Sequence, residues 1–330
     1  RPSGSRAMPG YSAYFDGTLT SPNVREFSVG YGMLIGSTGF AKVDLISRDW
    51  HDFYVSDRDQ STRKATTPFG IPVDLSLIRN SDNIKREYRG VQVQGRWNPR
   101  PVQTGFTYTY STLEGNDEGE TANSGPVANI DPATRYPEFY NHARFLPMGY
   151  VRGDQRHKVR AWIGYDVPLP AAVGRLNVSL LQTFDSGLPY SAVALISNNW
   201  AGAPSRTALG YNSLTSGQYY FSDRGEYRTD DVTSTNLAFR YARNVALGLE
   251  LFAQADVLNV LGEEGVADVT RVGTGVNTAA NDASLQAFNP FTETPVLGQH
   301  YTLAANFGQP TSNLAYQTPR TYRFSLGLRF

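Results

Sequence analysis

Apolar and polar residues alternate with a period of two along much of this chain. The side chains of a β-strand point alternately to its two faces, so this alternation predicts strands with one apolar and one polar face. Few segments show the period of an amphipathic helix, and we therefore predict an all-β protein. In the clearest case, 322–330, one face carries Tyr322, Phe324, Leu326, Leu328 and Phe330, and the other carries Arg323, Ser325, Gly327 and Arg329.

Nine segments carry this alternation and are predicted to be strands. They are 24–34, 38–55, 86–97, 102–113, 155–167, 174–187, 230–242, 246–258 and 319–330. Most exceed the about 5 or 6 residues that are usual for strands in globular proteins. They reach the about 9 to 11 residues that a tilted strand needs to cross a bilayer. The lengths therefore predict transmembrane strands, which we expect to be antiparallel.

The predicted connections alternate between short and long. The short ones are 35–37, 98–101, 168–173 and 243–245, and the long ones are 56–85, 114–154, 188–229 and 259–318. Loops of this length are uncommon in compact soluble domains. Short turns on one rim and long loops on the other are typical of outer-membrane barrels. We expect short periplasmic turns, long extracellular loops, and Phe330 at the periplasmic rim.

In a membrane the two faces of such a sheet meet different surroundings. Backbone groups in the bilayer core cannot pair with water, so the strands have to close into a barrel. We expect the apolar face to contact lipid and the polar face to line the lumen. Aromatic residues near strand ends are expected in the interfacial girdles. These residues are Trp50, Trp97, Tyr322 and Phe330.

Nine antiparallel strands cannot close a barrel, because the first and the ninth would run in the same direction. We therefore expect further strands upstream of residue 1 and interpret residues 1–330 as the carboxyl-terminal part of a larger barrel. The first ten residues lack the apolar segment of a signal peptide, so any export signal is also expected upstream.

Composition narrows the possible partners and sites. The 330 residues carry 30 Lys plus Arg and 30 Asp plus Glu, so the net charge of zero does not favour nucleic acid as a partner. There is no cysteine, which excludes disulfides and thiolate metal sites within this chain. No run of about 18 apolar residues occurs, so no membrane-spanning helix is predicted.

Six stretches in order resemble a known family. They are VREFSVGYG at 24–32, YRGVQVQG at 88–95, GDQRHKVRAWIGYDVP at 153–168, DSGLPYSA at 185–192, YYFSDRGEYRTDDVTSTNLA at 219–238 and ELFAQADVLNV at 250–260. Together with the terminal strand they resemble the carboxyl-terminal barrel of TonB-dependent outer-membrane receptors, specifically the Oar-like group. The resemblance runs from about residue 20 to the end.

The resemblance implies a barrel of about 22 strands, of which this chain would supply the last nine. The plug and amino-terminal domains of the family are not part of this chain. Such receptors bind a ligand outside a Gram-negative cell and move it across the outer membrane, using energy from the TonB complex. The implied partners are outer-membrane lipid, the barrel-assembly machinery, the TonB complex through upstream segments, and an extracellular ligand that the sequence does not name.

The terminal strand also resembles the signal that the barrel-assembly machinery reads. The matching residues are Tyr322, Phe324, Leu326, Leu328 and Phe330. An unpaired amphipathic strand can add to the edge of another sheet, which gives this role a physical basis. The same side chains would also serve simply as lipid-facing residues, and the two interpretations are compatible.

Two stretches of the predicted outer loops, 135–150 and 219–231, mix aromatic residues with arginine. Such side chains are typical anchors at binding surfaces. They could equally provide the local packing that long loops need. The candidate ligand contacts are Tyr136, Phe139, Tyr140, Arg144, Tyr219, Tyr220 and Arg224.

No enzyme, cofactor or metal site is predicted. The G-x-G at 30–32 lies in a predicted strand, where a phosphate-binding loop cannot form, and no G-x-S-x-G elbow occurs. The acidic stretch 114–120 could bind calcium but lacks the ligand spacing of an EF-hand, and a solvated loop explains it equally. The histidines lack the spacing of metal pairs. They are His51, His142, His157 and His300.

Two other kinds of protein remain open. A surface barrel without transport, such as an adhesin or a structural protein, would show the same strands and loops. A soluble β-sandwich or β-solenoid that binds carbohydrate would explain the alternation. It would not explain the strand lengths or the alternation of short and long connections.

Overall fold

A computed structural model describes residues 13–15, 18–58, 64–66, 69–70, 72–74, 76–117, 144, 146–197, 216–246 and 248–330. Over these residues the protein is all-β, as predicted, with two single turns of 3-10 helix at Val269–Arg271 and Asn313–Ala315. Within the described ranges, no helix has the length and apolar character that crossing a membrane requires.

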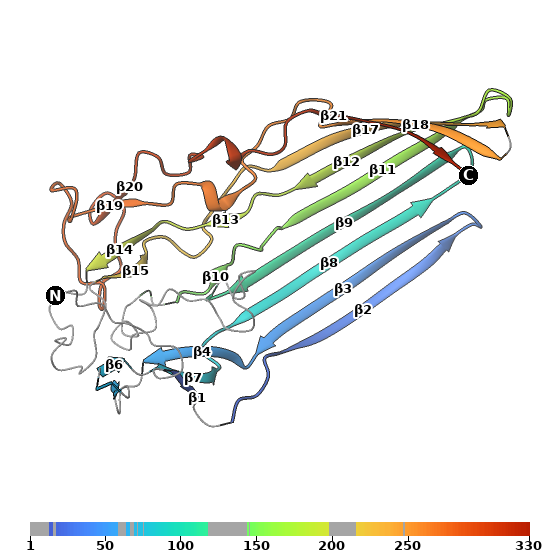
Figure 1. Ribbon diagram of the computed structural model, residues 1–330. Helices are drawn as coiled ribbons and strands as arrows, with labels where there is room; N and C mark the ends of the chain where they lie inside the picture. Colours follow the sequence, from blue (N-terminus) through green and yellow to red (C-terminus); the bar gives the residue numbers. More distant parts are fainter. Residues whose placement is uncertain are drawn as a thin grey trace.

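The main sheet is an antiparallel meander in which each long strand pairs with the next one along the chain (Figure 1). Its strands are β2 (Asn23–Ile35), β3 (Gly39–His51), β8 (Arg86–Trp97), β9 (Val102–Gly115), β11 (His157–Val167), β12 (Arg175–Asp185), β17 (Val232–Ala246), β18 (Leu249–Leu258) and β21 (Thr321–Arg329). The two-residue strand β10 (Gly149–Tyr150) adds to the end of β9. All nine predicted strands are confirmed, with ends that differ by a few residues.

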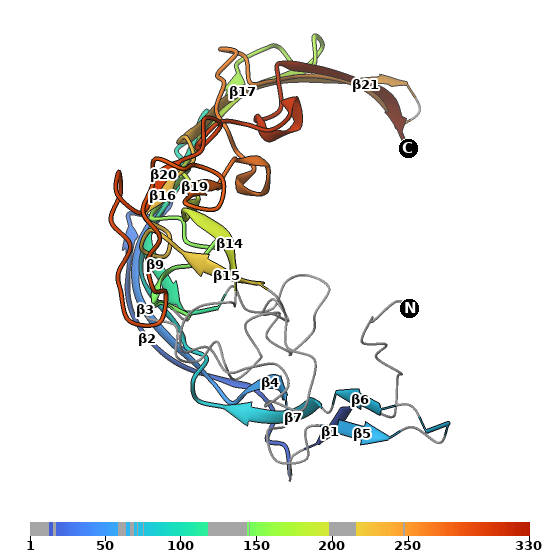
Figure 2. The ribbon, with the colours of Figure 1, turned by 90° about the vertical axis from the view of Figure 1, so that its left-hand side faces the viewer.

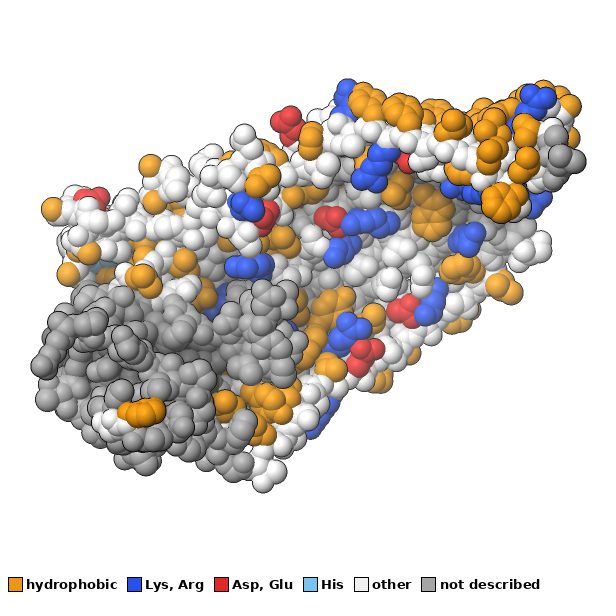
Figure 3. All heavy atoms as spheres, viewed as in Figure 1, with side chains coloured by type: hydrophobic (Ala, Val, Ile, Leu, Met, Phe, Trp, Pro, Cys, Tyr) orange, Lys and Arg blue, Asp and Glu red, His pale blue; other side chains and the backbone are white. Residues whose placement is uncertain are grey.

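The main sheet curves into an open trough, with β2 and β21 at its two edges (Figure 2). Its concave face is turned to the viewer in Figure 3, where Lys, Arg, Asp and Glu side chains are spread over the sheet. Residues that pair across neighbouring strands point to the same face of the sheet, so each face is made of rows that cross the strands. One row on the apolar, convex face contains Tyr165, Val178, Phe239, Ala255 and Phe324. One row on the concave face contains Asp44, Gln92, Thr109, Lys158 and Asp185.

The concave face also carries a few large apolar side chains, and glycines make room for them. A Cβ on Gly105 would collide with the indole of Trp162, its direct neighbour on β11. Gly327 on β21 leaves room for the ring of Phe252 on β18 in the same way. These glycines are therefore required by close packing across the strands.

The predicted strand 38–55 is too long, because the chain leaves the main sheet at Asp52. Asp52 has a φ of 59°, and the chain continues as β4 (Phe53–Arg58), which pairs with β7 (Ser76–Ser81). Phe53 and Val55 are buried there against Ile84. Trp50 lies on the concave face and packs against this cluster. Its predicted place in the outward aromatic girdle is therefore wrong.

The last short turn also differs from its prediction. The segment 243–245 belongs to β17, which continues to Ala246 through a register shift between Asn244 and Ala246. A bulge inserts an extra residue without ending the pairing, and alternation alone does not reveal it. Gly248, with a φ of 79°, lies in the turn instead.

The long loops carry small sheets of their own. They gather at the end of the main sheet opposite to the short turns (Figure 1). β1 (Ala13–Phe15) joins β7 and β4, and the two-stranded sheets pair β5 (Lys64–Thr66) with β6 (Pro72–Asp74), β13 (Pro189–Tyr190) with β16 (Tyr227–Arg228), β14 (Val193–Ser197) with β15 (Ser216–Tyr220), and β19 (Val276–Thr278) with β20 (Tyr301–Leu303).

The largest buried apolar cluster of the described residues lies among these loops and not on the main sheet. It joins the loop 186–231 to the loop 259–320. Its buried members are Ala192, Ile196, Tyr219, Phe221, Val276, Phe288 and Tyr301. The described parts of the two loops therefore form one packed body with a hydrophobic core.

Candidate functional site

The convex face of the main sheet is a continuous apolar band. The side chains of Tyr322, Phe324, Leu326 and Leu328 on β21 and of Phe330 directly after it are all exposed, with Phe324 at 78%. On β2 the apolar row runs from Phe27 to Ile35, about 27 Å along the strand and about 19 Å in height at a tilt of about 45°. The apolar band of an outer-membrane barrel is about 25 Å tall. A contiguous apolar surface of this extent marks an interface with lipid or with another protein.

Charged and aromatic side chains border this band at both ends. Toward the long loops, Arg25, Asp49, Glu87 and Glu114 form one row on the convex face. Arg89 in the next row pairs with Asp49 at 2.8 Å. Toward the short turns, Trp97 and Arg243 are exposed. The expected girdle position of Trp97 fits this arrangement, because amphipathic side chains favour the boundary between hydrocarbon and water.

Two of the candidate ligand contacts, Tyr220 and Arg224, fasten two long loops together. Arg224 is only 3% exposed. Its guanidinium donates to the carbonyl oxygens of Pro147 at 2.7 Å and Asn116 at 2.9 Å, and it lies 4.5 Å from the centre of the Tyr220 ring. The charge of Arg224 is thus compensated inside the protein by carbonyl groups and an aromatic face.

Tyr219 and Arg144 also make internal contacts. Tyr219 is fully buried, with its ring edge-on to Phe221 and Phe288 at centroid distances of 5.3 and 5.7 Å. Arg144 donates to the carbonyl oxygen of Ser222 and, at 2.7 Å, to the carboxylate of Asp223. The structure therefore brings Arg144, Tyr219, Tyr220 and Arg224 together as packing residues of the loops, and ligand contact by them stays a prediction. Tyr136, Phe139 and Tyr140 lie outside the described residues.

A second buried set of contacts joins the loops, through Asp154 and Arg228, and the sequence did not single it out. The side chain of Asp154 is fully buried; it accepts a hydrogen bond from the backbone N–H of Leu113 at 2.7 Å and forms an ion pair with Arg228. Arg228 also donates to the carbonyl oxygen of Gly187 at 2.9 Å, and its guanidinium lies over the ring of Tyr150 at 5.3 Å. Asp154 and Arg228 belong to two of the stretches that carry the family resemblance. That resemblance was the available signal for them.

Burial in the loop core shifts the acidity of its tyrosines. It raises the pKa of Tyr219 to about 12, although the nearby positive charge of Arg144 acts in the opposite direction. Burial likewise raises the pKa of Tyr227 and of Tyr301. These phenols therefore stay neutral at physiological pH, which suits a core that holds the loops together.

The concave face is polar and contains a hollow of about 1000 Å³ near the short turns. Polar and charged groups on its wall bond to one another. Asn177 donates to Asp166 at 2.8 Å, and Arg240 donates to Gln254 at 3.0 Å. Glu250 pairs with Arg175 and with Arg329. Such a wall suits contact with water or with a polar partner rather than with lipid.

In the part of the chain that the structure describes, no group of three or more His, Cys, Asp or Glu side chains is arranged so that it could hold a metal ion. His157 bonds to the hydroxyl of Tyr108 at 2.9 Å, and His300 accepts from the backbone N–H of Val296 at 3.0 Å. In the acidic stretch 114–120, the side chain of Asn116 ties the backbone of Lys85 to that of Asn83. Residues 118–120 and His142 lie outside the described ranges.

The chain resembles solved structures, of which one is described here. No model of a known protein family matches the chain, and no curated protein matches it. A similar solved structure is the outer membrane transporter YddB from Escherichia coli, with 13% sequence identity and a TM-score of 0.49. The match covers 79% of this chain and 32% of the transporter chain, so this chain spans about a third of that protein. At this level of similarity, the strand pairing described above remains the evidence for the fold.

Proposed function

We propose that this chain forms part of the wall of a β-barrel in the outer membrane of a Gram-negative bacterium. The observation that carries the proposal is the two-faced main sheet, whose strands are long enough to cross a bilayer and whose convex face is apolar from β2 to β21. Exposure of such a surface to water costs free energy, whereas contact with the hydrocarbon of a bilayer does not. The polar concave face is then the lumenal side.

Closure of the barrel follows from the same environment. In the described part of the chain, β2 and β21 each have a neighbour in the main sheet on one side only. Unpaired N–H and C=O groups at such an edge are costly in hydrocarbon. We therefore propose that further strands complete the barrel, and about 22 strands remains the prediction from the family resemblance.

For the activity we propose TonB-dependent uptake or export of a ligand that the long loops bind outside the cell. The packed core between the loops 186–231 and 259–320 supports a preformed binding surface, since a surface that is ordered in advance loses less entropy on binding. The polar hollow of the concave face supports a wet or polar-filled lumen. We propose no chemical reaction for this protein.

The same loop core also supports the second candidate, a surface barrel that holds a partner without transport. Binding to the TonB complex distinguishes the transporter from the surface barrel. The full-length protein, purified in detergent, should retain the carboxyl-terminal domain of TonB if it is a transporter. If the protein is folded, was extracted from the outer membrane and does not bind TonB, the surface barrel is favoured.

The membrane orientation can be tested with cysteines, because this chain has none of its own. In whole cells, Ala280→Cys in the exposed outer loop should react with a membrane-impermeant maleimide. Ser37→Cys, in the turn between β2 and β3, should react only after the outer membrane is permeabilised. The full-length parent serves as the control. Labelling of both positions in intact cells would contradict the proposed orientation.

A further inference from the structure

We propose that the convex face binds one anionic phospholipid from the periplasmic leaflet, with an acyl chain in a groove along β18 and the phosphate at Arg243. This inference rests on the outer-membrane location proposed above. It concerns a specific site on the apolar face, beyond general contact with the bilayer.

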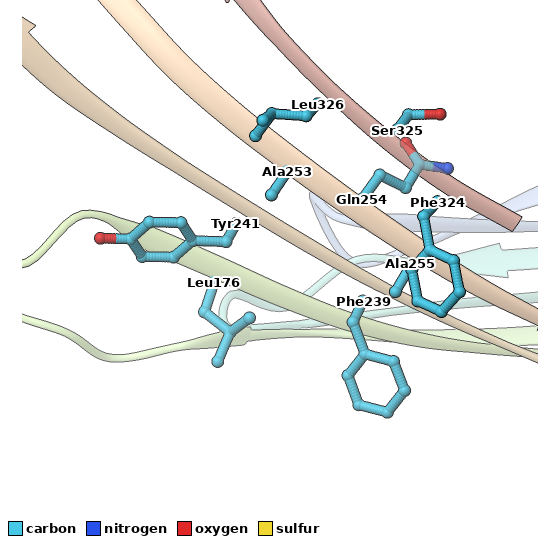
Figure 4. A pocket seen from close by; sticks show the side chains of 9 residues that line it. All are labelled: Leu176, Phe239, Tyr241, Ala253, Gln254, Ala255, Phe324, Ser325 and Leu326. Carbon is cyan, nitrogen blue, oxygen red and sulfur yellow. The ribbon is translucent and has the colours of Figure 1, made fainter.

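The groove follows β18 between two higher walls, and its hollow has a volume of about 420 Å³ (Figure 4). Its floor is formed by Ala253 and Ala255. Both neighbours of each alanine are large: Ala255 lies between Phe239 and Phe324. Tyr241 and Leu326 flank Ala253 in the same way, and Gln254 and Ser325 turn their side chains to the other face of the sheet. The lining is therefore almost entirely hydrocarbon.

The groove is long enough to hold an extended acyl chain. Larger side chains end the alanine floor at Leu251 on one side and at Val257 on the other. The distance between these two residues is about 20 Å along the strand. A strand tilted by about 45° then covers about 14 Å of depth, close to half of a hydrocarbon core of about 30 Å.

One wall of the groove is held in place by the neighbouring turn. The hydroxyl of Tyr241 donates a hydrogen bond to the carbonyl oxygen of Val173. Gly174 follows with a φ of 120°, and a Cβ there would lie 2.7 Å from the carbonyl oxygen of Ala242. The Tyr241 ring is thus fixed before any ligand arrives, which lowers the entropic cost of binding in the groove.

Arg243 supplies the charge that selects a phosphate. It is exposed, follows Tyr241 on the same face of β17, and lies opposite Leu251 at the end of the groove near the short turns. Among the described residues, no carboxylate pairs with it. The nearby ion pairs of Glu250 with Arg175 and Arg329 lie on the concave face. An arginine at this depth attracts the phosphate of a lipid headgroup through charge-assisted hydrogen bonds.

These features fit a lipid better than another protein. A stable protein interface needs about 1,000 Å² with good complementarity, and it usually includes several hydrogen bonds. The groove is narrow, has a hydrocarbon lining and offers a single cation at one end. That combination matches a molecule with one long apolar chain and one anionic group.

The test uses the full-length protein, extracted from outer membranes in a mild detergent and titrated with phosphatidylglycerol. Native mass spectrometry counts the bound lipids. We expect one phosphatidylglycerol to bind more tightly than the rest. Arg243→Gln should weaken this binding roughly fivefold, the loss expected for one cation near a lipid surface. The double variant Ala253→Phe with Ala255→Phe should abolish it, because the two rings fill the groove.

Matched variants on the same face keep the test specific. Ala41→Phe and Arg25→Gln change the convex face outside the groove and should leave the tight binding unchanged. If the filled variant is folded in the outer membrane and still binds the lipid tightly, the inference is wrong, while the proposed function stands. If the wild type is dimeric and the filled variant monomeric, the groove is an interface between copies. Absence of the wild type from the outer membrane would overturn the proposed function itself.

Discussion

At the scale of single residues, this protein exposes apolar side chains and buries charged ones. Phe324 on β21 is 78% exposed, whereas Asp154 and Arg224 in the loops are almost completely buried. The exposed row becomes favourable once lipid covers it. The buried charges are tolerated because each has a charged, carbonyl or aromatic partner.

Loss of the Asp154 carboxylate should loosen the long loops. Asp154→Ala removes the carboxylate that pairs with Arg228 and leaves the N–H of Leu113 without its acceptor, so we expect a loss of about 3 kcal/mol in local stability. Asp223→Ala is the matched control, because Asp223 pairs with Arg144 while its own side chain is 83% exposed. That change should cost below about 1 kcal/mol. Hydrogen exchange of residues 146–156 and 220–229 measures the difference.

Two glycines of the concave face should respond differently to one added methyl group. In Gly105→Ala the new Cβ meets the indole of Trp162 and forces it to move, at a cost of about 1 to 3 kcal/mol. Gly164→Ala places its Cβ no closer than 3.7 Å to any neighbour and should be nearly neutral. Urea titration of the refolded full-length protein compares the two variants. Equal midpoints would show that the indole moves without cost.

At the scale of elements, strands and loops owe their stability to different contacts. The long strands are joined by backbone ladders from β2 to β21 and expose most of their large apolar side chains. The loops are held together by aromatic clusters and by the buried contacts of Arg224 and Arg228. The loop end therefore behaves like a small globular body attached to a two-faced sheet.

The loop core should lose stability in alkaline solution. Burial raises the pKa of Tyr219 from its ordinary value of 10.0 to about 12 in the folded protein. Its contribution is therefore complete below pH 10 and is lost as the pH rises toward 12, by about 3 kcal/mol in all. Near-ultraviolet circular dichroism of the aromatic residues follows this transition. Tyr219→Phe, which cannot ionise, should shift it to higher pH, and an unshifted transition would assign it to other residues.

At the scale of the whole molecule, the sheet is curved (Figure 2) and carries charged side chains on its concave face (Figure 3), whereas the register and the exposed residues make its convex face apolar. The register maintains this separation across all the long strands, because a slip by one residue would exchange the faces of a strand. The loops gather at one end and the turns at the other (Figure 1). This polarity along the strands is the arrangement that an outer-membrane protein requires.

A charge on the convex face should impair insertion far more than the same charge on the concave face. Leu326→Arg places a guanidinium in the apolar band and should destabilise the inserted protein by about 2 to 4 kcal/mol. Ser325→Arg, one residue away on the polar face, should be tolerated. The amount of heat-modifiable full-length protein in the outer-membrane fraction reports on both. If Ser325→Arg were the harmful change, the inside and the outside would have been interchanged.

Sequence alternation was sufficient to predict the nine strands, their order and the residues that share each face. It could do so because side chains of a strand alternate strictly, and because the apolar face of the sheet carries few polar residues. The short and long connections were equally visible, apart from the bulge that extends β17 and the turn at Asp52 that ends β3. Both exceptions depend on backbone conformations that a period-two pattern does not encode.

The tertiary structure alone decided how the loops pack and what their arginines do. Arg144, Tyr219 and Arg224 could be singled out by composition, but only folding shows that their side chains contact other residues of the loops. The groove on β18 is a similar case, since two alanines become its floor only when their larger neighbours on β17 and β21 are known. Contacts between residues far apart in the chain depend on register and loop packing, whereas the face of a strand depends on its local pattern alone.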